Sequence, residues 1–295
     1  MKKQLAFALG GGGARGALQV GALRALLEAG YQPALLAGTS TGAINAAFLA
    51  SRGMTLQSID DLTQAWRDAM QADLLPQNYL WLTVLSIFRR SEADASRRLR
   101  DFFLAHGLDP DLRFGDIQGL RLILVAADLN SGRAVIYGQD PQQSVLEGLL
   151  ASSALPPWVA PIEIDGQLLM DGGVVSNLPI QPAMAAGATE IIALDLADPG
   201  LLAQDSFGFG SFLSRLLHTV DSRQLELELA LAAAQGVPVR YIHLTSEQPV
   251  PVWDFHRTEE LIERGYALTR SEILRWQAER PPGLRGWLQR IGKIG

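Results

Sequence analysis

Two glycine-rich stretches near the start of the chain contain the residues best suited to chemistry. Residues 38–42 read Gly-Thr-Ser-Thr-Gly and place Ser40 between two glycines, after a short apolar run. This setting is typical of a nucleophile mounted on a sharp turn between a strand and a helix. Residues 10–16 read Gly-Gly-Gly-Gly-Ala-Arg-Gly and precede a predicted helix, so their backbone N–H groups form a natural cradle for negative charge. A nucleophile beside an anion site favours acyl-transfer chemistry.

A serine hydroxyl needs a base in hydrogen-bond contact, and the best candidate is Asp171. It directly follows a predicted hairpin strand, and two glycines after it let other backbone pass close by. Burial would raise its pKa from about 3.9 and make it a more effective base near neutral pH. Asp128 and Asp195 also end apolar strands and compete with it, and a turn aspartate that caps its own loop is an equally good interpretation of Asp171. The histidines lie in no comparable setting and are interpreted as surface or packing residues: His106, His218, His243 and His256.

The glycine run also fits a different class of protein. Gly11, Gly13 and Gly16 satisfy the spacing of a dinucleotide-binding loop between a strand and a helix. That site needs an acidic residue about 20 residues further on, to bind the ribose, and residues 37–40 contain none. A nucleotide-binding enzyme is therefore disfavoured, and the run suits an oxyanion hole instead. The common α/β-hydrolase order does not fit either, because the serine turn comes too early in the chain.

Composition narrows the function classes further. The chain of 295 residues has a formal net charge of −6 and no long basic run, which gives nucleic-acid binding no electrostatic support. The absence of cysteine excludes disulfides, thiolate zinc sites and a cysteine nucleophile. No metal or other cofactor is expected, since the sequence contains no calcium loop and no clustered ligand set. Neither a signal peptide nor a membrane-spanning stretch is recognised, so we expect a cytoplasmic protein, with peripheral contact at the inner membrane surface as an option.

The predicted elements alternate between strands and helices, which indicates one α/β domain on a largely parallel sheet. Strands are predicted at residues 5–9, 34–37, 122–127, 134–137, 162–164, 167–169, 191–194 and 239–244. Helices are predicted at residues 16–29, 41–50, 58–70, from about 91 to 106, in a long stretch ending near 236, and at 258–278. Asp165-Gly166 predicts a tight turn between two of the strands. We expect a domain over residues 1–280, followed by a short basic amphipathic tail at 281–295.

Three motifs in order resemble those of the patatin-like phospholipase family of acyl hydrolases. The glycine run resembles its oxyanion loop, the Ser40 turn its nucleophile motif, and Asp171-Gly172-Gly173 its aspartate motif. Residues 151–157, which include Ser152 and Ser153, resemble the segment before the third motif. The resemblance implies a three-layer α/β/α fold, ester bonds of lipids as substrate, and a Ser40–Asp171 dyad without histidine. It implies an oxyanion hole from the N–H groups of Gly11, Gly12, Gly13, Ala14 and Arg15, supported by Gly10, Gly16, Gly38, Gly42, Gly172 and Gly173. Ser152 and Ser153 are then structural.

The sequence leaves substrate and partners open. A peptidase or other acyl hydrolase with the same dyad, or a non-catalytic regulatory protein of this fold, remains an alternative to a lipid esterase. Two segments have the composition for peripheral membrane contact: residues 79–90 combine aromatic and aliphatic bulk with two arginines, and residues 284–294 form a basic amphipathic pattern. An ordinary buried helix is the commoner outcome for the first pattern. The sequence does not indicate the oligomeric state.

Overall fold

One eight-stranded sheet organises the protein. The computed structural model describes residues 3–71, 92–156, 158–197 and 209–279. Both candidate membrane segments, 79–90 and 284–294, and the predicted tail lie outside these residues. The strands are β1 (Leu5–Leu9), β2 (Leu35–Thr39), β3 (Arg121–Asp128), β4 (Arg133–Tyr137), β5 (Ile162–Ile164), β6 (Gln167–Asp171), β7 (Glu190–Ala197) and β8 (Val239–Thr245).

The centre of the sheet is parallel, as the alternating pattern predicted. The strand order is β5-β6-β3-β2-β1-β7-β8, with β4 paired to β3 outside this path. All pairs from β3 to β8 along the path are parallel. The carboxyl ends of parallel strands share one edge of a sheet, which is where ligand sites form in such folds. The first glycine stretch follows β1 at this edge, and Ser40 follows β2.

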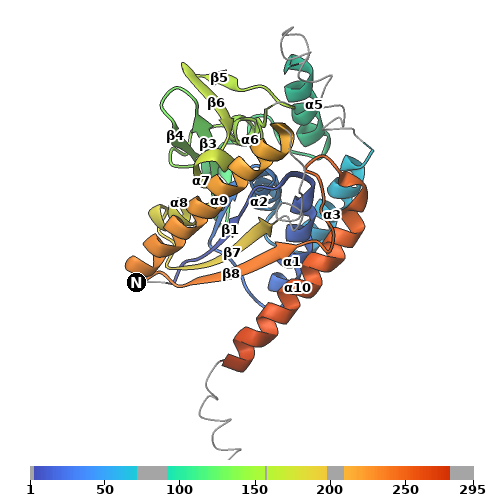
Figure 1. The fold of residues 1–295 in the computed structure, drawn as a ribbon, viewed down its shortest axis with the longest axis vertical. Helices are drawn as coiled ribbons and strands as arrows, with labels where there is room; N and C mark the ends of the chain where they lie inside the picture. Colours follow the sequence, from blue (N-terminus) through green and yellow to red (C-terminus); the bar gives the residue numbers. More distant parts are fainter. Residues whose placement is uncertain (1–2, 72–91, 157, 198–208, 280–295) are drawn as a thin grey trace, which may run out of the picture.

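Helices cover both faces of the sheet, which gives three layers (Figure 1). Side chains of β1 alternate: Phe7 and Leu9 pack into a large core with the first helices and the last one, whereas Ala6 and Ala8 pack into a smaller core on the other face. The helices are α1 (Ala17–Glu28), α2 (Thr41–Arg52), α3 (Leu56–Ala69), α5 (Glu92–Ala105), α6 (Val145–Ser152), α7 (Gly173–Ser176), α8 (Ile180–Ala185), α9 (Phe209–Ala234) and α10 (Thr258–Glu279), with 3-10 turns at Gly13–Gly16, Phe114–Asp116 and Phe255–Arg257. Among the described helices, none combines the length and apolar character needed to cross a bilayer.

One edge of β3 has two successive partners, and this arrangement shapes the site. Strand β2 pairs with β3 in parallel up to the register position Thr39–Val125. Strand β6 then pairs with β3 in the antiparallel sense, beginning at Asp171–Ala126. Because β4 occupies the opposite edge of β3 over these residues, β6 continues along the edge that β2 leaves. The predicted hairpin delivers β6: Asp165 and Gly166 have φ angles of 51° and 76°, as a tight two-residue turn requires.

Candidate active site

Ser40 occupies a strained turn between β2 and α2. Its φ of 56° and ψ of −125° lie in a region that residues with a side chain rarely adopt. The flanking glycines make the turn feasible by allowing close backbone approach. A Cβ at position 42 would overlap the carbonyl group of Leu9, and one at position 38 would stand 2.7 Å from the Cα of Ala43. The sequence pattern around Ser40 therefore corresponds to a real steric requirement.

Hydrogen bonds from two sides hold this strained turn. The N–H of Ser40 donates to Oγ of Ser152 over 2.9 Å, and that hydroxyl donates in turn to the carbonyl oxygen of Val125 over 2.6 Å. On the other side, Oγ1 of Thr39 donates to the carbonyl oxygen of Ser176 over 2.8 Å. Strained conformations persist only where the surroundings over-determine them, and these contacts supply that support. The structural role expected of Ser152 is therefore specific, because it fixes the backbone of Ser40.

The side chain of Asp171 is buried at the end of β6, one register position beyond Thr39 along the edge of β3. Its Oδ1 accepts the N–H of Gly173 over 2.8 Å, and its Oδ2 is buried without a regular hydrogen bond from the described residues. Burial raises the pKa of Asp171 to about 6, and hydrogen bonding from the Ser40 side chain and from Gly173 opposes this rise. The register on β3 brings the end of β2, which precedes Ser40, and Asp171 to successive positions of one strand edge.

The glycine loop lies against the Ser40 turn. A Cβ at position 11 would stand 2.9 Å from Cβ of Ser40, so only glycine leaves room at this contact. Several amides of the loop are already engaged: those of Gly11, Ala14 and Arg15 donate to the carbonyl oxygens of Asn177, Val252 and Gly12, respectively. Within the described residues, the amides of Gly12 and Gly13 donate no hydrogen bond. These two N–H groups are the ones available to an incoming anion.

Residues 173–181 connect the three predicted motifs, a role that no sequence pattern indicated. Asn177 contacts the glycine loop, because its carbonyl oxygen accepts the N–H of Gly11 over 3.2 Å. Ser176 supports Thr39, as described above, and its hydroxyl donates to Glu228 of α9 over 2.5 Å. Gln224, also on α9, accepts the N–H of Asn177 over 3.2 Å. These partners are 47 to 166 residues apart in the chain, so no local pattern could have revealed them.

The competing aspartates are engaged elsewhere. Asp128 closes its own turn by accepting the hydroxyl of Ser131 and the N–H of Asn130. Asp195 accepts the hydroxyl of Tyr241 and lies 3.6 Å from Nδ1 of His243. Both therefore have structural partners of their own, and Asp171 is the one whose pKa responds to Ser40.

The histidines are placed largely as interpreted. His243 lies at the Asp195 cluster, where the hydrogen bond to Asp195 raises its pKa. His256 is exposed in a 3-10 turn, and His218 lies on α9. His106 lies 3.1 Å from Asp68 through Nε2 and 2.9 Å from the carbonyl oxygen of Phe102 through Nδ1. Among the hydrogen bonds of the described residues, none joins a histidine to Ser40.

A second, half-buried carboxyl with a raised pKa, on α9, was not anticipated. Asp221 lies on α9, and burial raises its pKa to about 7. The negative charges of Asp195 and Asp171 add to this rise, and the positive charge of Arg15 opposes it. Within the described residues, no group of three or more histidine, aspartate and glutamate side chains has the geometry of a metal site.

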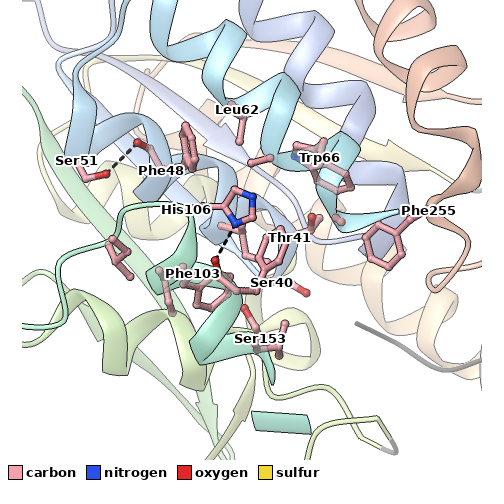
Figure 2. Close-up of a pocket in the computed structure, with 18 of the residues that line it drawn as sticks. Ser40, Thr41, Phe48, Ser51, Leu62, Trp66, Phe103, His106, Ser153 and Phe255 are labelled. Atoms are coloured by element: carbon pink, nitrogen blue, oxygen red, sulfur yellow. Dashed lines mark hydrogen bonds between the residues drawn. The ribbon is translucent and has the colours of Figure 1, made fainter. Parts of the chain in front are cut away.

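A cavity opens from Ser40 into the layer formed by α2, α3 and α5. Its volume is about 100 Å³. Its polar lining residues are Ser40, Thr41, Ser51, Arg52, His106 and Ser153, and Gly13 also lines it. Figure 2 shows the aromatic and aliphatic side chains around them, which come mainly from α2, α3 and α5. The apolar walls are Ile44, Phe48, Leu62, Ala65, Trp66, Ala69, Leu99, Phe102, Phe103, Leu108, Leu149, Leu155 and Phe255.

Comparison with known proteins identifies the family to which the chain belongs. The sequence matches the patatin-like phospholipase family over residues 7–184, which is more than half of the chain and contains both Ser40 and Asp171. The chain belongs to this family. The resemblance seen in the three motifs is thus confirmed, and so is the three-layer fold with a largely parallel sheet.

Proteins similar to this patatin-like chain occur in mammals and in bacteria. The mouse protein named patatin-like phospholipase domain-containing protein 6 is 32% identical over 193 residues, which are 65% of this chain and 13% of the mouse protein. YqhO of Bacillus subtilis (strain 168) is 29% identical over 297 residues, covering 90% of this chain and 97% of YqhO. VipD from Legionella pneumophila has a similar fold, with a TM-score of 0.51 and 14% identity over 92% of this chain and 67% of VipD. The chain thus spans only a small part of the mammalian relatives that it matches.

Proposed function

We propose that this patatin-like chain is a serine acyl hydrolase that cleaves carboxylic ester bonds of lipids. Ser40 is the nucleophile, Asp171 is the base, and the amides of Gly12 and Gly13 form the oxyanion hole. The observation that carries this proposal is the register on β3. Val125 pairs with Thr39 and Ala126 pairs with Asp171, so the strained serine and the buried carboxyl occupy successive positions of one strand edge.

The electrostatics of Asp171 suit the role of a base. A carboxylate with an ordinary pKa attracts a proton weakly at neutral pH, whereas a pKa of about 6 lies close to the working range. Asp171 would then be ionised at pH 7 and ready to accept the proton of Ser40 as Oγ attacks the ester carbon. The N–H of Gly173 holds Oδ1 and leaves Oδ2 for this proton transfer.

The oxyanion hole follows from the amides that the loop leaves unused. The sequence resemblance implied the amides of residues 11–15, but those of Gly11, Ala14 and Arg15 already donate to carbonyl oxygens of the protein. We therefore assign only the amides of Gly12 and Gly13 as donors of the oxyanion hole. Gly13 also lines the cavity together with Ser40, which supports this assignment. Backbone donors fixed in advance stabilise the tetrahedral intermediate without reorganisation.

The reaction then has two balanced steps. In acylation, Oγ of Ser40 bonds to the acyl carbon, the bond from that carbon to the alkoxy oxygen breaks, and the serine proton passes through Asp171 to the departing oxygen. In deacylation, a water molecule gives a proton to Asp171 as its oxygen bonds to the acyl carbon. The bond between that carbon and Oγ of Ser40 then breaks, the carboxylic acid leaves, and the proton returns from Asp171 to Oγ. The apolar cavity next to Ser40 suits the acyl chain of a lipid.

The proposal is tested with a chromogenic ester and a fluorophosphonate that labels activated serines. We expect the wild-type protein to hydrolyse the ester and to form one adduct, on Ser40, detected by mass spectrometry. Ser40→Ala should abolish both, and Asp171→Asn should reduce hydrolysis by at least about 10³-fold, because the nucleophile loses its base.

Matched variants separate chemistry from folding. Asp128→Asn changes the competing aspartate, and Ser222→Ala removes an exposed serine hydroxyl on α9. Both should keep wild-type turnover, and all four variants should keep the wild-type far-UV circular dichroism. Undiminished turnover in Ser40→Ala, or an adduct on another serine, would refute the assignment of the nucleophile.

A further inference from the structure

The two adjacent serines at the end of α6 differ sharply in their surroundings. The hydroxyl of Ser152 is fully engaged, since it accepts the N–H of Ser40 and donates to Val125. The hydroxyl of Ser153 is also buried, with the residue 8% exposed, but its Oγ has no hydrogen-bond partner among the described residues. A buried hydroxyl without a partner lowers stability, and alanine at this position would avoid that cost. Ser153 therefore needs an explanation other than folding.

The cavity supplies that explanation, because Ser153 lines it together with Ser40 (Figure 2). A polar atom without a hydrogen-bond partner among the described residues, in a mainly apolar wall, is suited to binding a polar atom of a ligand. Ligand sites of this kind combine apolar walls with a few placed polar groups. Whatever occupies the cavity next to Ser40 can therefore satisfy the hydroxyl of Ser153.

The neighbours of Ser153 show on which side of Ser40 it lies. Ser152 bonds to Val125 of β3, and the carbonyl oxygen of Ala154 accepts the N–H of Asp171 over 2.9 Å. Ser153 thus belongs to a segment fastened to β3 and β6. The glycine loop follows β1, on the opposite side of β2 in the strand order. An alkoxy oxygen that takes a proton from Asp171 must approach that carboxyl group, so it lies on the same side of Ser40 as Ser153.

We propose that the Ser153 hydroxyl binds the oxygen atom that exchanges a proton with Asp171. This inference depends on the proposed hydrolase function. In acylation that atom is the alkoxy oxygen of the ester, to which Ser153 donates a hydrogen bond as the bond to the acyl carbon breaks. In deacylation the attacking water occupies the same position and donates to Oγ of Ser153. Ser153 neither gains nor loses a proton, and the proton still moves between Ser40, Asp171 and the bound oxygen.

The test compares an oxygen ester with a thioester of the same acyl group, using Ser153→Ala. We expect kcat/KM, which reports acylation, to fall about tenfold for the oxygen ester, as loss of one hydrogen bond implies. For the thioester it should fall less than about threefold, because sulfur is a weak hydrogen-bond acceptor. The melting temperature should stay the same or rise, since the variant removes a buried hydroxyl that the protein does not satisfy. A structural serine would produce the opposite change in melting temperature.

Thr269 provides a matched control away from the site. Its Oγ1 on α10 is also buried without a hydrogen-bond partner among the described residues. Thr269→Val should likewise preserve the melting temperature, but it should leave both kcat/KM values unchanged.

Three outcomes of this experiment would overturn the role of Ser153: equal falls for both esters, no fall for the oxygen ester, or a melting temperature lowered by several degrees. Each can occur while the wild-type protein hydrolyses esters and forms the Ser40 adduct, so the proposed function would stand. If the wild-type protein did neither, the proposed function would fail and the inference with it.

Discussion

At the scale of single residues, the proposed role of Asp171 as a base links activity and stability to the same proton. Its pKa is raised to about 6 by burial, well above the value of about 4 expected in an unfolded chain. The proposed base must be ionised to act, so we expect kcat/KM to rise with pH through about 6 and to level off above it. A pH–rate profile measured from pH 4.5 to 8 tests this. A rise centred near pH 4 would contradict burial of the carboxyl.

The same shift predicts how stability depends on pH. Between about pH 4 and 6 the folded protein holds this proton and the unfolded chain does not, so the free energy of unfolding falls as pH rises, by about 3 kcal/mol in all. Asp171→Asn removes the titrating group. It should therefore be more stable than the wild-type protein at pH 7.5, where the wild-type carboxylate is ionised and buried. Urea unfolding at pH 4.5 and 7.5 measures the difference.

Asp128 is the control with the opposite sign. The hydroxyl of Ser131 and the N–H of Asn130 lower its pKa, so its contribution is present at neutral pH and is lost as pH falls through the folded-state pKa. Asp128→Asn should accordingly be less stable than the wild-type protein at pH 7.5. Equal changes in both variants would show that the two carboxyls do not differ in environment.

The candidate catalytic side chains could be predicted from the sequence, but the residues that hold their backbone in place could not. Ser40 and Asp171 could be recognised because glycines lie next to them in the sequence. These glycines are required where other backbone passes close by, so a short stretch of sequence is enough to indicate the site. Ser152 and Asn177 carry no such mark. They matter because they meet Ser40 and Gly11, which lie 112 and 166 residues away. The same is true of Ser153, whose lack of a partner is visible only after folding.

At the scale of elements, helix α9 fastens the segment that joins the three motifs. Both carboxylate oxygens of Glu228 accept hydrogen bonds, Oε1 from the hydroxyl of Ser176 and Oε2 from the N–H of Gln181 over 2.8 Å. Ser176 supports Thr39 directly, and its neighbour Asn177 supports Gly11. A helix that touches neither Ser40 nor Asp171 in these contacts therefore stabilises the backbone around both.

Glu228→Ala tests this role because alanine offers no acceptor in place of the two carboxylate oxygens. The hydroxyl of Ser176 and the N–H of Gln181 would lose their partner, so we expect the free energy of unfolding to fall by about 1–2 kcal/mol. Fluorophosphonate labelling of Ser40 should also slow, because Thr39 and Gly11 lose rigid neighbours. Glu226→Ala is the matched control: Glu226 is exposed on the same helix and pairs with Arg223 over 2.6 Å. This control should change the free energy of unfolding by less than about 0.5 kcal/mol and the labelling rate by less than about twofold.

Most helices and strands were predictable, because their periodicity is contained in a short stretch of sequence. The pairing of β3 with β2 in parallel and then with β6 in the antiparallel sense was not predictable. The alternation of strands and helices indicated a parallel sheet, and the turn at Asp165-Gly166 indicated the hairpin. Nothing in either strand of that hairpin specifies that β6 continues the edge of β3 left by β2. That pairing depends on contacts between distant residues, which a short window of sequence does not contain.

At the scale of the whole molecule, the first and last described helices close the domain. Helix α10 packs along α1 (Figure 1), and their crossing is made close by one glycine on each helix. A Cβ at position 265 would overlap the carbonyl oxygen of Leu18, and a Cβ at position 21 would overlap that of Ile262. The family match ends at residue 184, but this crossing makes the later part of the chain integral to the same core.

Gly265→Ala should therefore weaken the whole domain rather than one helix. Alanine favours an isolated helix by about 1 kcal/mol over glycine, but here its methyl group meets backbone that cannot rotate away. We expect the free energy of unfolding to fall by about 2–3 kcal/mol, in a single transition seen equally by circular dichroism and tryptophan fluorescence. Ser271→Ala, at an exposed position of α10, should stay within about 0.5 kcal/mol of the wild-type protein. Separate transitions for the two probes would mean that α10 unfolds on its own, and that the core joining the two ends of the chain is not cooperative.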